Sequence, residues 1–316
     1  MCMKFRFRRV AILLGCFLVS MLGSYAQSLP RSADRAKDVS SLSSGRFDPW
    51  RNPTIGPYAP SSPGDADLGE QHILRSIDGY QPFNFQLTQR AIWTDNAALT
   101  NRDELSDFYS DTQLRLSYLP QIANNTFAEI SAGYAFYRYA DYSGLDFDDL
   151  EVSVGAVHVF RGLNDLSLRL RYNYERLLAA RSHDELFTDH SIEFGLYYPI
   201  PLGPRHFAYG GYTSEFSLSG NPGYAGRDEH EFIVGYTYSP TDRIELSSYY
   251  RLYVHDYVQG GRTDLLQTAG LYMTTHLTER IDLVLSASYS NNDSDLRGGD
   301  YDAGEAGAIV SLNFEF

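Results

Sequence analysis

The stretch that decides the fold is Asp165–Leu177, with the sequence DLSLRLRYNYERL. Apolar and aromatic side chains occupy its even positions from 166 to 174, and polar side chains occupy the odd positions from 167 to 175. A helix would scatter the two sets around its circumference, whereas a strand separates them onto opposite faces. Its 13 residues exceed the usual strand length in soluble proteins and suit a tilted strand that crosses a membrane. The stretch therefore predicts a transmembrane β-strand.

The same alternation continues from Tyr80 to the last residue. It predicts twelve strands, at residues 83–94, 108–119, 126–139, 150–160, 165–177, 190–199, 206–217, 229–238, 243–255, 265–275, 281–291 and 304–316. The segment 265–275 alternates poorly, which leaves ten or fourteen strands as alternatives. The connections alternate between short, at 120–125, 161–164, 200–205, 239–242 and 276–280, and longer, at 95–107, 140–149, 178–189, 218–228, 256–264 and 292–303. Alternating tight turns and larger loops are typical of outer-membrane barrels.

Charged and aromatic residues follow the same division. Asp, Glu, Lys and Arg sum to −14 over the six longer connections, with Glu229 included, and to +1 over the five short ones. Tyr and Phe cluster near strand ends on the apolar face, as Tyr172 and Tyr174 do. Such rings lie at the headgroup level in outer-membrane barrels, although both are also good strand formers. Together these patterns predict an all-β fold, an antiparallel transmembrane β-barrel of 12 strands over residues 80–316 in the cell outer membrane.

Three segments carry a resemblance to known proteins. The last predicted strand ends with GAIVSLNFEF, residues 307–316, which alternates and stops on Phe316. It resembles the C-terminal signal of Gram-negative outer-membrane β-barrels. The junction Ile92–Asn96 and the segment Asn291–Ser294 resemble β-barrel porin families. The resemblance covers residues 80–316 and implies that the barrel assembly machinery recognises Phe316 as an assembly signal; it identifies no solute.

The first 26 residues have the anatomy of an export signal. A basic segment at 1–9 precedes an apolar run at 10–23, and Ser24 and Ala26 supply the small residues for cleavage before Gln27. A lipoprotein signal at Cys16 is the alternative, but the apolar run continues past that cysteine. Residues 27–79 are rich in Ser, Pro, Gly and Asp and show no sustained period, which predicts a disordered, flexible periplasmic linker. The alternative is a plug in the pore, with Trp50 and Tyr58 as anchors.

The composition argues against several classes of protein. Both cysteines, Cys2 and Cys16, lie in the predicted signal, so the mature chain is expected to have no disulfide, thiolate metal site or cysteine nucleophile. Removing the four basic residues of the signal changes the net charge from −14 to −18, which argues against nucleic acid as a partner. The mean hydropathy of −0.33 argues against a helical membrane protein but is compatible with a barrel.

Motifs for catalysis and metal binding are weak. Asp228-Glu229-His230 has the Asp-x-His spacing of the omptin proteases, but His230 is in phase with the lipid-facing set and away from luminal water. The histidines lack ligand spacing, so neither a metal nor a cofactor is expected. Acidic clusters at 140–149 and 292–303 suit weak Ca²⁺ or Mg²⁺ binding that bridges to lipopolysaccharide phosphates. A solvated, repulsive acidic rim is the interpretation that the sequence favours, because runs of charge are usually solvated faces.

The inward face is the most informative feature for function. Following the alternation inward gives five arginines and eleven acids: Arg90, Arg115, Arg169, Arg171, Arg251, Asp111, Glu129, Glu151, Glu175, Glu193, Glu215, Glu231, Glu245, Asp282, Glu305 and Glu315. Charges at this density would each cost several kcal/mol in a dry apolar core, so the lumen is expected to be hydrated or closed by Arg–Glu pairs. The arginines and the later glutamates are expected to lie partly opposite one another across the lumen. Tyr137, Tyr197, Tyr249 and Tyr253 also point inward, as sugar-stacking faces or as filler.

These features predict a porin-like channel for passive diffusion of small hydrophilic solutes, with a mild preference for cations because acids outnumber bases. The expected partners are outer-membrane lipid, lipopolysaccharide, the assembly machinery and those solutes. A non-conducting structural or surface barrel, closed by the ion pairs of its lumen, is the second hypothesis. An omptin-like hydrolase with a site at the rim is the third.

Overall fold

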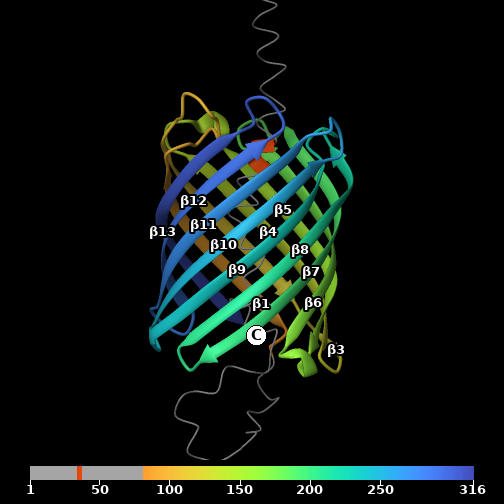
Figure 1. The fold of residues 1–316 in the computed structure, drawn as a ribbon, viewed down its shortest axis with the longest axis vertical. Helices are drawn as coiled ribbons and strands as arrows, with labels where there is room; N and C mark the ends of the chain where they lie inside the picture. Colours follow the sequence, from red (N-terminus) through yellow and green to blue (C-terminus); the bar gives the residue numbers. More distant parts are fainter. Residues whose placement is uncertain (1–33, 38–80) are drawn as a thin grey trace, which may run out of the picture.

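The computed structural model describes residues 34–37 and 81–316, and its strands form a closed antiparallel barrel (Figure 1). The strands are β1 (Phe83–Thr94), β2 (Asp107–Tyr118), β3 (Gln121–Ala123), β4 (Thr126–Tyr139), β5 (Phe147–Phe160), β6 (Leu166–Ala179), β7 (Glu185–Gly203), β8 (His206–Asn221), β9 (Arg227–Thr241), β10 (Ile244–Tyr257), β11 (Thr263–His276), β12 (Ile281–Ser294) and β13 (Tyr301–Glu315). Short 3₁₀ turns, η4 (Ser143–Leu145) and η5 (Arg161–Leu163), follow β4 and β5.

The barrel closes because β1 pairs on one edge with β2 and on the other with β13. Phe83 and Phe316 complete the β1–β13 seam with two backbone hydrogen bonds of 3.0 Å, one in each direction. β2 pairs directly with β4, and the three-residue β3 pairs only with β4, so twelve long strands make the wall. Each of these twelve long strands is paired on both edges, which is what a barrel surrounded by lipid requires.

The predicted strands are confirmed, and the alternatives of ten and fourteen are wrong. The doubtful segment is the full strand β11, whose inward positions include Leu266 and Thr268, both buried. Its alternation fails in the sequence because an apolar side chain, Leu266, faces inward, while the polar Gln267 faces outward and accepts a 2.7 Å hydrogen bond from Tyr250. Several strands also extend beyond their predicted bounds, as β7 does over 19 residues, because backbone pairing continues where the side-chain alternation has ended.

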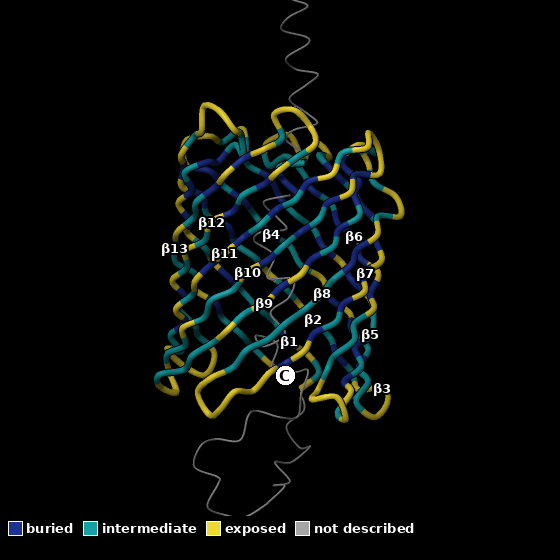
Figure 2. Tube along the Cα trace, in the orientation of Figure 1, coloured by how far each residue is buried: buried dark blue, intermediate teal, exposed yellow. Residues whose placement is uncertain are grey.

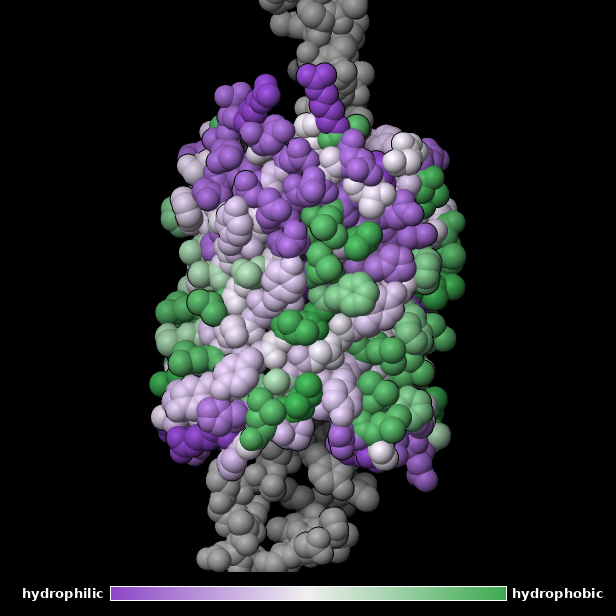
Figure 3. Space-filling view, viewed as in Figure 1, coloured by the Kyte–Doolittle hydropathy of each residue, from purple (hydrophilic) through white to green (hydrophobic). Residues whose placement is uncertain are grey.

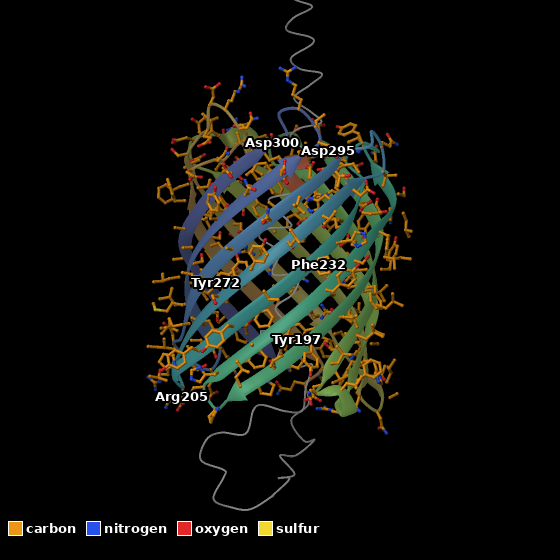
Figure 4. All side chains as sticks on the ribbon, in the orientation of Figure 1. Tyr197, Arg205, Phe232, Tyr272, Asp295 and Asp300 are labelled. Carbon is orange, nitrogen blue, oxygen red and sulfur yellow. The ribbon has the colours of Figure 1, made fainter. Side chains whose placement is uncertain are left out.

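The two ends of the barrel differ in the way the sequence predicts. We call the end with the long connections the loop end, and the end with the short connections, where β1 begins and β13 finishes, the turn end. Asp295 and Asp300 lie in the β12–β13 connection at the loop end, and Arg205 lies in the β7–β8 connection at the turn end (Figure 4). Hydrophilic residues gather at the loop end on the face shown in Figure 3.

More buried and more exposed residues alternate along much of the long strands, as in β5 and β7 (Figure 2). The outer surface carries exposed apolar residues on strands around the barrel, among them Leu114, Leu116, Val152, Val154, Leu170, Ile192, Phe232, Val234 and Leu271. An apolar band around a closed barrel is the surface that hydrocarbon solvates, and such barrels occur in outer membranes. Within residues 34–37 and 81–316, no helix is long and apolar enough to cross a membrane.

The helical residues Asp34–Lys37 lie inside the barrel at its loop end, where Figure 1 shows them in red. Ala36 and Lys37 are buried, and Ala36 belongs to the same buried apolar cluster as Tyr109, Tyr137 and Phe187 of the barrel interior. The predicted signal at 1–26 and the anchors Trp50 and Tyr58 lie outside the described residues. The choice between linker and plug for the whole of 27–79 therefore stays a prediction.

Candidate functional site in the barrel lumen

A row of charged side chains runs around the inner wall along the hydrogen-bonding direction. Cross-strand register places one inward residue of each of seven consecutive strands in this row: Gly155, Arg171, Glu193, Glu215, Glu229, His255 and Asp264. The six side chains after the glycine are all buried. We call this row the lumen belt. It extends from β5 to β11, so the charges predicted separately from each strand form one continuous feature.

Arg171 links the belt to its acidic neighbours on both sides. Its Nη2 donates to Glu193 Oε2 on the next strand at 2.6 Å, and its Nη1 lies 3.9 Å from Glu129 Oε1 on β4. Gly155 on β5 lies between Arg171 and Glu129, and a Cβ there would be 2.4 Å from the Cβ of Arg171. The absence of a side chain at position 155 therefore lets the guanidinium reach across β5.

A second arginine uses the same arrangement. Arg115 on β2 donates to Glu151 on β5 at 2.8 Å, and Gly133 on β4 lies between them in the register. Both Arg–Glu contacts thus span an intervening strand at a position without a side chain. The pattern depends on which residues the register aligns, so it was not visible in the sequence of any single strand.

The remaining predicted lumen arginines also face acids close to them on the wall. Arg169 Nε lies 3.1 Å from Glu129, Arg251 Nε lies 3.4 Å from Glu231, and Arg90 Nε lies 3.4 Å from Asp111. These contacts lie along the wall, and the expectation that the arginines and the later glutamates lie partly opposite one another across the lumen stays a prediction. Strand neighbours approach to ~5 Å between backbones, so opposite charges pair along the wall before they can face each other across it.

Other predicted lumen residues take hydroxyl partners or lie near the turn end. Glu215 accepts a 2.7 Å hydrogen bond from Ser191, and Glu305 accepts one of 3.1 Å from Tyr109. Glu245 lies near the turn end, with its side chain 41% exposed and 3.8 Å from His276 Nε2. Of the inward tyrosines, Tyr137 is buried and stacks on Phe147 with ring centroids 4.2 Å apart. This tyrosine therefore fills space in the interior and offers no exposed face to a sugar.

Sequence reasoning missed an apolar cluster inside the loop end of the barrel. Its buried members within the described residues are Ala36, Ile92, Ala97, Tyr109, Ala135, Tyr137, Tyr139, Phe147, Leu177, Phe187 and Ala225. Most come from strand ends and loops, where period-2 alternation gives no direction. The available signal was the run of inward aromatic residues at 109, 137 and 139.

The helical residues 34–37 contact strands on several sides of this cluster. Asp34 accepts a 2.8 Å hydrogen bond from Arg262 Nη1, just before β11. The Arg35 guanidinium lies 5.1 Å from the ring centroid of Tyr139 on β4, and Lys37 contacts β7 and β9. Asp34, Arg35 and Lys37 thus contact the barrel at β4, β7, β9 and the connection before β11.

The residues of the candidate protease and cation sites make hydrogen bonds and ring contacts within the barrel. His230 faces outward, where Tyr212 Oη lies 3.0 Å from its Nδ1 and the ring of Phe216 packs edge-on against it. Asp228 accepts the backbone N–H of Ser217 at 3.0 Å. Acids of the connections similarly accept backbone N–H groups, as Asp146 does from Tyr139 at 2.8 Å and Asp300 from Ser294 at 2.9 Å. The described residues contain no group of three or more His, Cys, Asp and Glu placed to hold a metal ion.

The two segments that resemble porin families meet at the start of β13. Asn96 donates to the backbone oxygen of Asp302 at 2.7 Å, and Asn291 donates to the carboxylate of Asp302 at 2.6 Å. Gly304 N–H donates to Asp95 at 2.7 Å. Asp95 and Asn96 thus join the residues that follow β1 to β13 at the loop end, and Asn291 joins β12 to β13 there.

Comparison with known proteins rests on the fold, because no protein-family model and no curated protein matches the sequence. An outer membrane channel from Pseudomonas putida F1 is similar, with a TM-score of 0.53 and 9% identity, over 74% of this chain and 96% of that one. The chain shares the β-barrel fold of that channel. The NanC porin has a TM-score of 0.41 and 14% identity, over 73% of this chain and 100% of the porin. The translocator domain of the autotransporter NalP from Neisseria meningitidis has a TM-score of 0.41 and 12% identity, over 74% and 88%.

Proposed function

We propose that this barrel is a porin-like channel for the passive diffusion of small hydrophilic solutes. The observation that carries the proposal is the lumen belt, a continuous row of charged and polar side chains on the inner wall of a membrane-spanning barrel. These side chains are buried and several pair along the wall, but their charge and polarity favour a hydrated solute in the interior over the lipid outside the barrel. No residue acts as a catalyst in this function.

The proposed channel prefers cations. Within the belt, Arg171 is the basic residue between β6 and β11 while Glu193, Glu215, Glu229 and Asp264 are acids. The loop end adds a further surplus of acids. An excess of fixed negative charge enriches cations and depletes anions at a pore mouth.

Planar-bilayer recording of the full chain tests the proposal. We expect discrete, ohmic current steps, and in a KCl gradient a zero-current potential with the sign of cation selectivity. A protein that inserts as a folded barrel but never produces steps would favour a structural barrel closed by its wall ion pairs. Steps with the sign of anion selectivity would retain the channel and reject the cation preference.

A further inference from the structure

Lys37 is held by three groups of the inner wall at the loop end. Its Nζ lies 3.6 Å from Asp189 Oδ2 on β7 and 3.6 Å from Glu229 Oε1 on β9. The same Nζ lies 4.8 Å from the ring centroid of Phe187. Two carboxylates and the face of an aromatic ring form the set of groups that attracts an organic ammonium ion.

The wall groups are anchored independently of Lys37. Asp189 accepts a 2.6 Å hydrogen bond from Ser217 through its other oxygen, Oδ1. Glu229 accepts one of 2.9 Å from Arg227 Nε, and Arg227 also donates to Tyr257 at 3.0 Å. All these partners belong to strands of the barrel, so the site keeps its shape and its chemistry if Lys37 leaves.

The charge of the wall around the site is negative. Glu175, Asp189 and Glu229 act on the Lys37 ammonium, while Arg227 is the wall cation that opposes them. Burial alone would lower the pKa of Lys37. The attraction of the carboxylates, of which Glu229 contributes most, is larger than this effect, so the pKa lies above the ordinary lysine value. Lys37 is therefore an ammonium ion, and its departure leaves three acids beside one arginine.

We propose that the groups around Lys37 form a binding site for soluble organic primary ammonium ions, and that Lys37 occupies it as a competitor built into the chain. The proposal rests on the channel function above and names its solute class as alkylamines, including diamines and lysine-like compounds. Lys37 resembles such a solute chemically, because its side chain is a primary ammonium group at the end of four methylene groups.

The effective concentration of the Lys37 ammonium at its own site determines how much soluble amine is needed to displace it. A group tethered to its site behaves like a free ligand at an effective concentration on the order of millimolar. A second contact, between Asp34 and Arg262, holds the same helical residues at 2.8 Å. A soluble amine must therefore displace Lys37 in the wild-type chain, whereas it enters a vacant site once the Lys37 ammonium has been removed.

The probe for this site is 1,5-diaminopentane, which carries an ammonium on an alkyl chain like that of lysine. Single-channel currents of the full chain would be recorded with the wild type and with Lys37→Met, which removes the charge and preserves most of the side-chain volume. We expect the diamine to block Lys37→Met at a concentration at least tenfold lower than it blocks the wild type. Adding Asp189→Asn and Glu229→Gln to Lys37→Met should abolish that difference, while tetramethylammonium, which lacks N–H donors, should block all variants weakly.

Two outcomes separate this proposal from the channel function. Equal block of the wild type and Lys37→Met, in channels that conduct normally, would overturn the amine site and leave the channel intact. If no variant conducts, the channel function fails, and the site is tested by calorimetric titration of the folded, detergent-solubilised Lys37→Met chain with 1,5-diaminopentane. Binding that is lost with the two carboxamide substitutions would support the site; no binding would reject it. Heat-modifiable migration identifies the folded barrel in every variant.

Discussion

Arg171 on β6 and Glu193 on β7 form a buried ion pair between adjoining strands, with Nη2 and Oε2 2.6 Å apart. Their side chains are 3% and 1% exposed, so little solvent screens the pair. Such a pair repays its desolvation only when both partners are present. The wall of the lumen is therefore sensitive to the loss of either charge alone.

Replacing Arg171 with Met should destabilise the barrel by about 3–5 kcal/mol, because Glu193 and Glu129 then lose their shared cation in a buried site. The double substitution Arg171→Met and Glu193→Gln should recover part of that loss. Equilibrium unfolding in urea with reconstituted protein would measure both. Arg297→Met, at an exposed position in the β12–β13 connection, is the control and should change stability by less than about 0.5 kcal/mol. A single substitution at Arg171 no worse than this control would mean that the pair contributes nothing.

Gly155→Ala tests the close approach of β5 and β6. The added Cβ would lie 2.3 Å from the carbonyl oxygen of Leu170 and 2.4 Å from Arg171 Cβ. Overpacking of this kind costs about 1–3 kcal/mol, so the urea midpoint should fall. Gly144→Ala is the matched control, because nothing lies within 4 Å of a Cβ built there. The same midpoint for both variants would show that the strands separate without strain.

The sequence predicts this barrel well where side-chain facing alone decides the structure. Alternation along one strand reports which side chains face lipid, and it located all twelve wall strands, including β1 at its observed bounds Phe83–Thr94. It does not report which inward residues become neighbours, because that depends on the register of each pairing. The Arg171–Glu193 pair and the crossing over Gly155 needed that register, and so lay beyond sequence reasoning.

The contacts of residues 34–37 at the loop end could not be predicted for a different reason. Residues 34–37 have no period and lie far in sequence from Asp189 and Glu229, so no local pattern connects Lys37 with its partners. The buried apolar cluster around Ala36 is likewise assembled from several strand ends and loops. Long-range contacts of this kind are set by closure of the barrel rather than by propensity.

Val154→Arg tests the assignment of the lipid-facing side. Val154 is 50% exposed near the middle of β5, and an arginine at the bilayer midplane costs about 2–4 kcal/mol. Phe160→Arg lies on the same face at the last residue of β5, where the cost falls to about 0–1 kcal/mol. Unfolding from lipid vesicles would compare the two. Similar losses at both positions would contradict a membrane that spans the middle of the strand.

Removal of Phe316 should impair insertion while synthesis and export continue. Phe316 exchanges two 3.0 Å backbone hydrogen bonds with Phe83 and stacks on its ring at 5.6 Å, so it completes the β1–β13 seam. An open seam exposes backbone groups that lipid cannot satisfy. We expect several-fold less heat-modifiable barrel in the membrane fraction, whereas Phe316→Tyr, which keeps the ring and the backbone, should behave like the wild type. Normal amounts of barrel after truncation would count against this role.

The last prediction concerns ion selectivity and depends on the surplus of acids in the lumen. Glu193, Glu215 and Glu231 lie on three successive strands, and their partners are Arg171, Ser191 and Arg251, respectively. Replacing all three with Gln removes three negative charges and leaves both arginines in place. The lumen should then attract cations less, so the cation/anion permeability ratio at 0.1 M salt should fall.

Salt concentration separates this electrostatic effect from a change in pore shape. The Debye length falls from ~10 Å at 0.1 M to ~3 Å at 1 M, so the difference between the wild type and the triple variant should shrink at high salt. Zero-current potentials at the two concentrations measure it, with Glu279→Gln in the exposed β11–β12 turn as the control. A triple variant that still conducts and keeps the wild-type potential at 0.1 M would show that these acids do not set selectivity. A difference that persists unchanged at 1 M would point to altered pore dimensions instead.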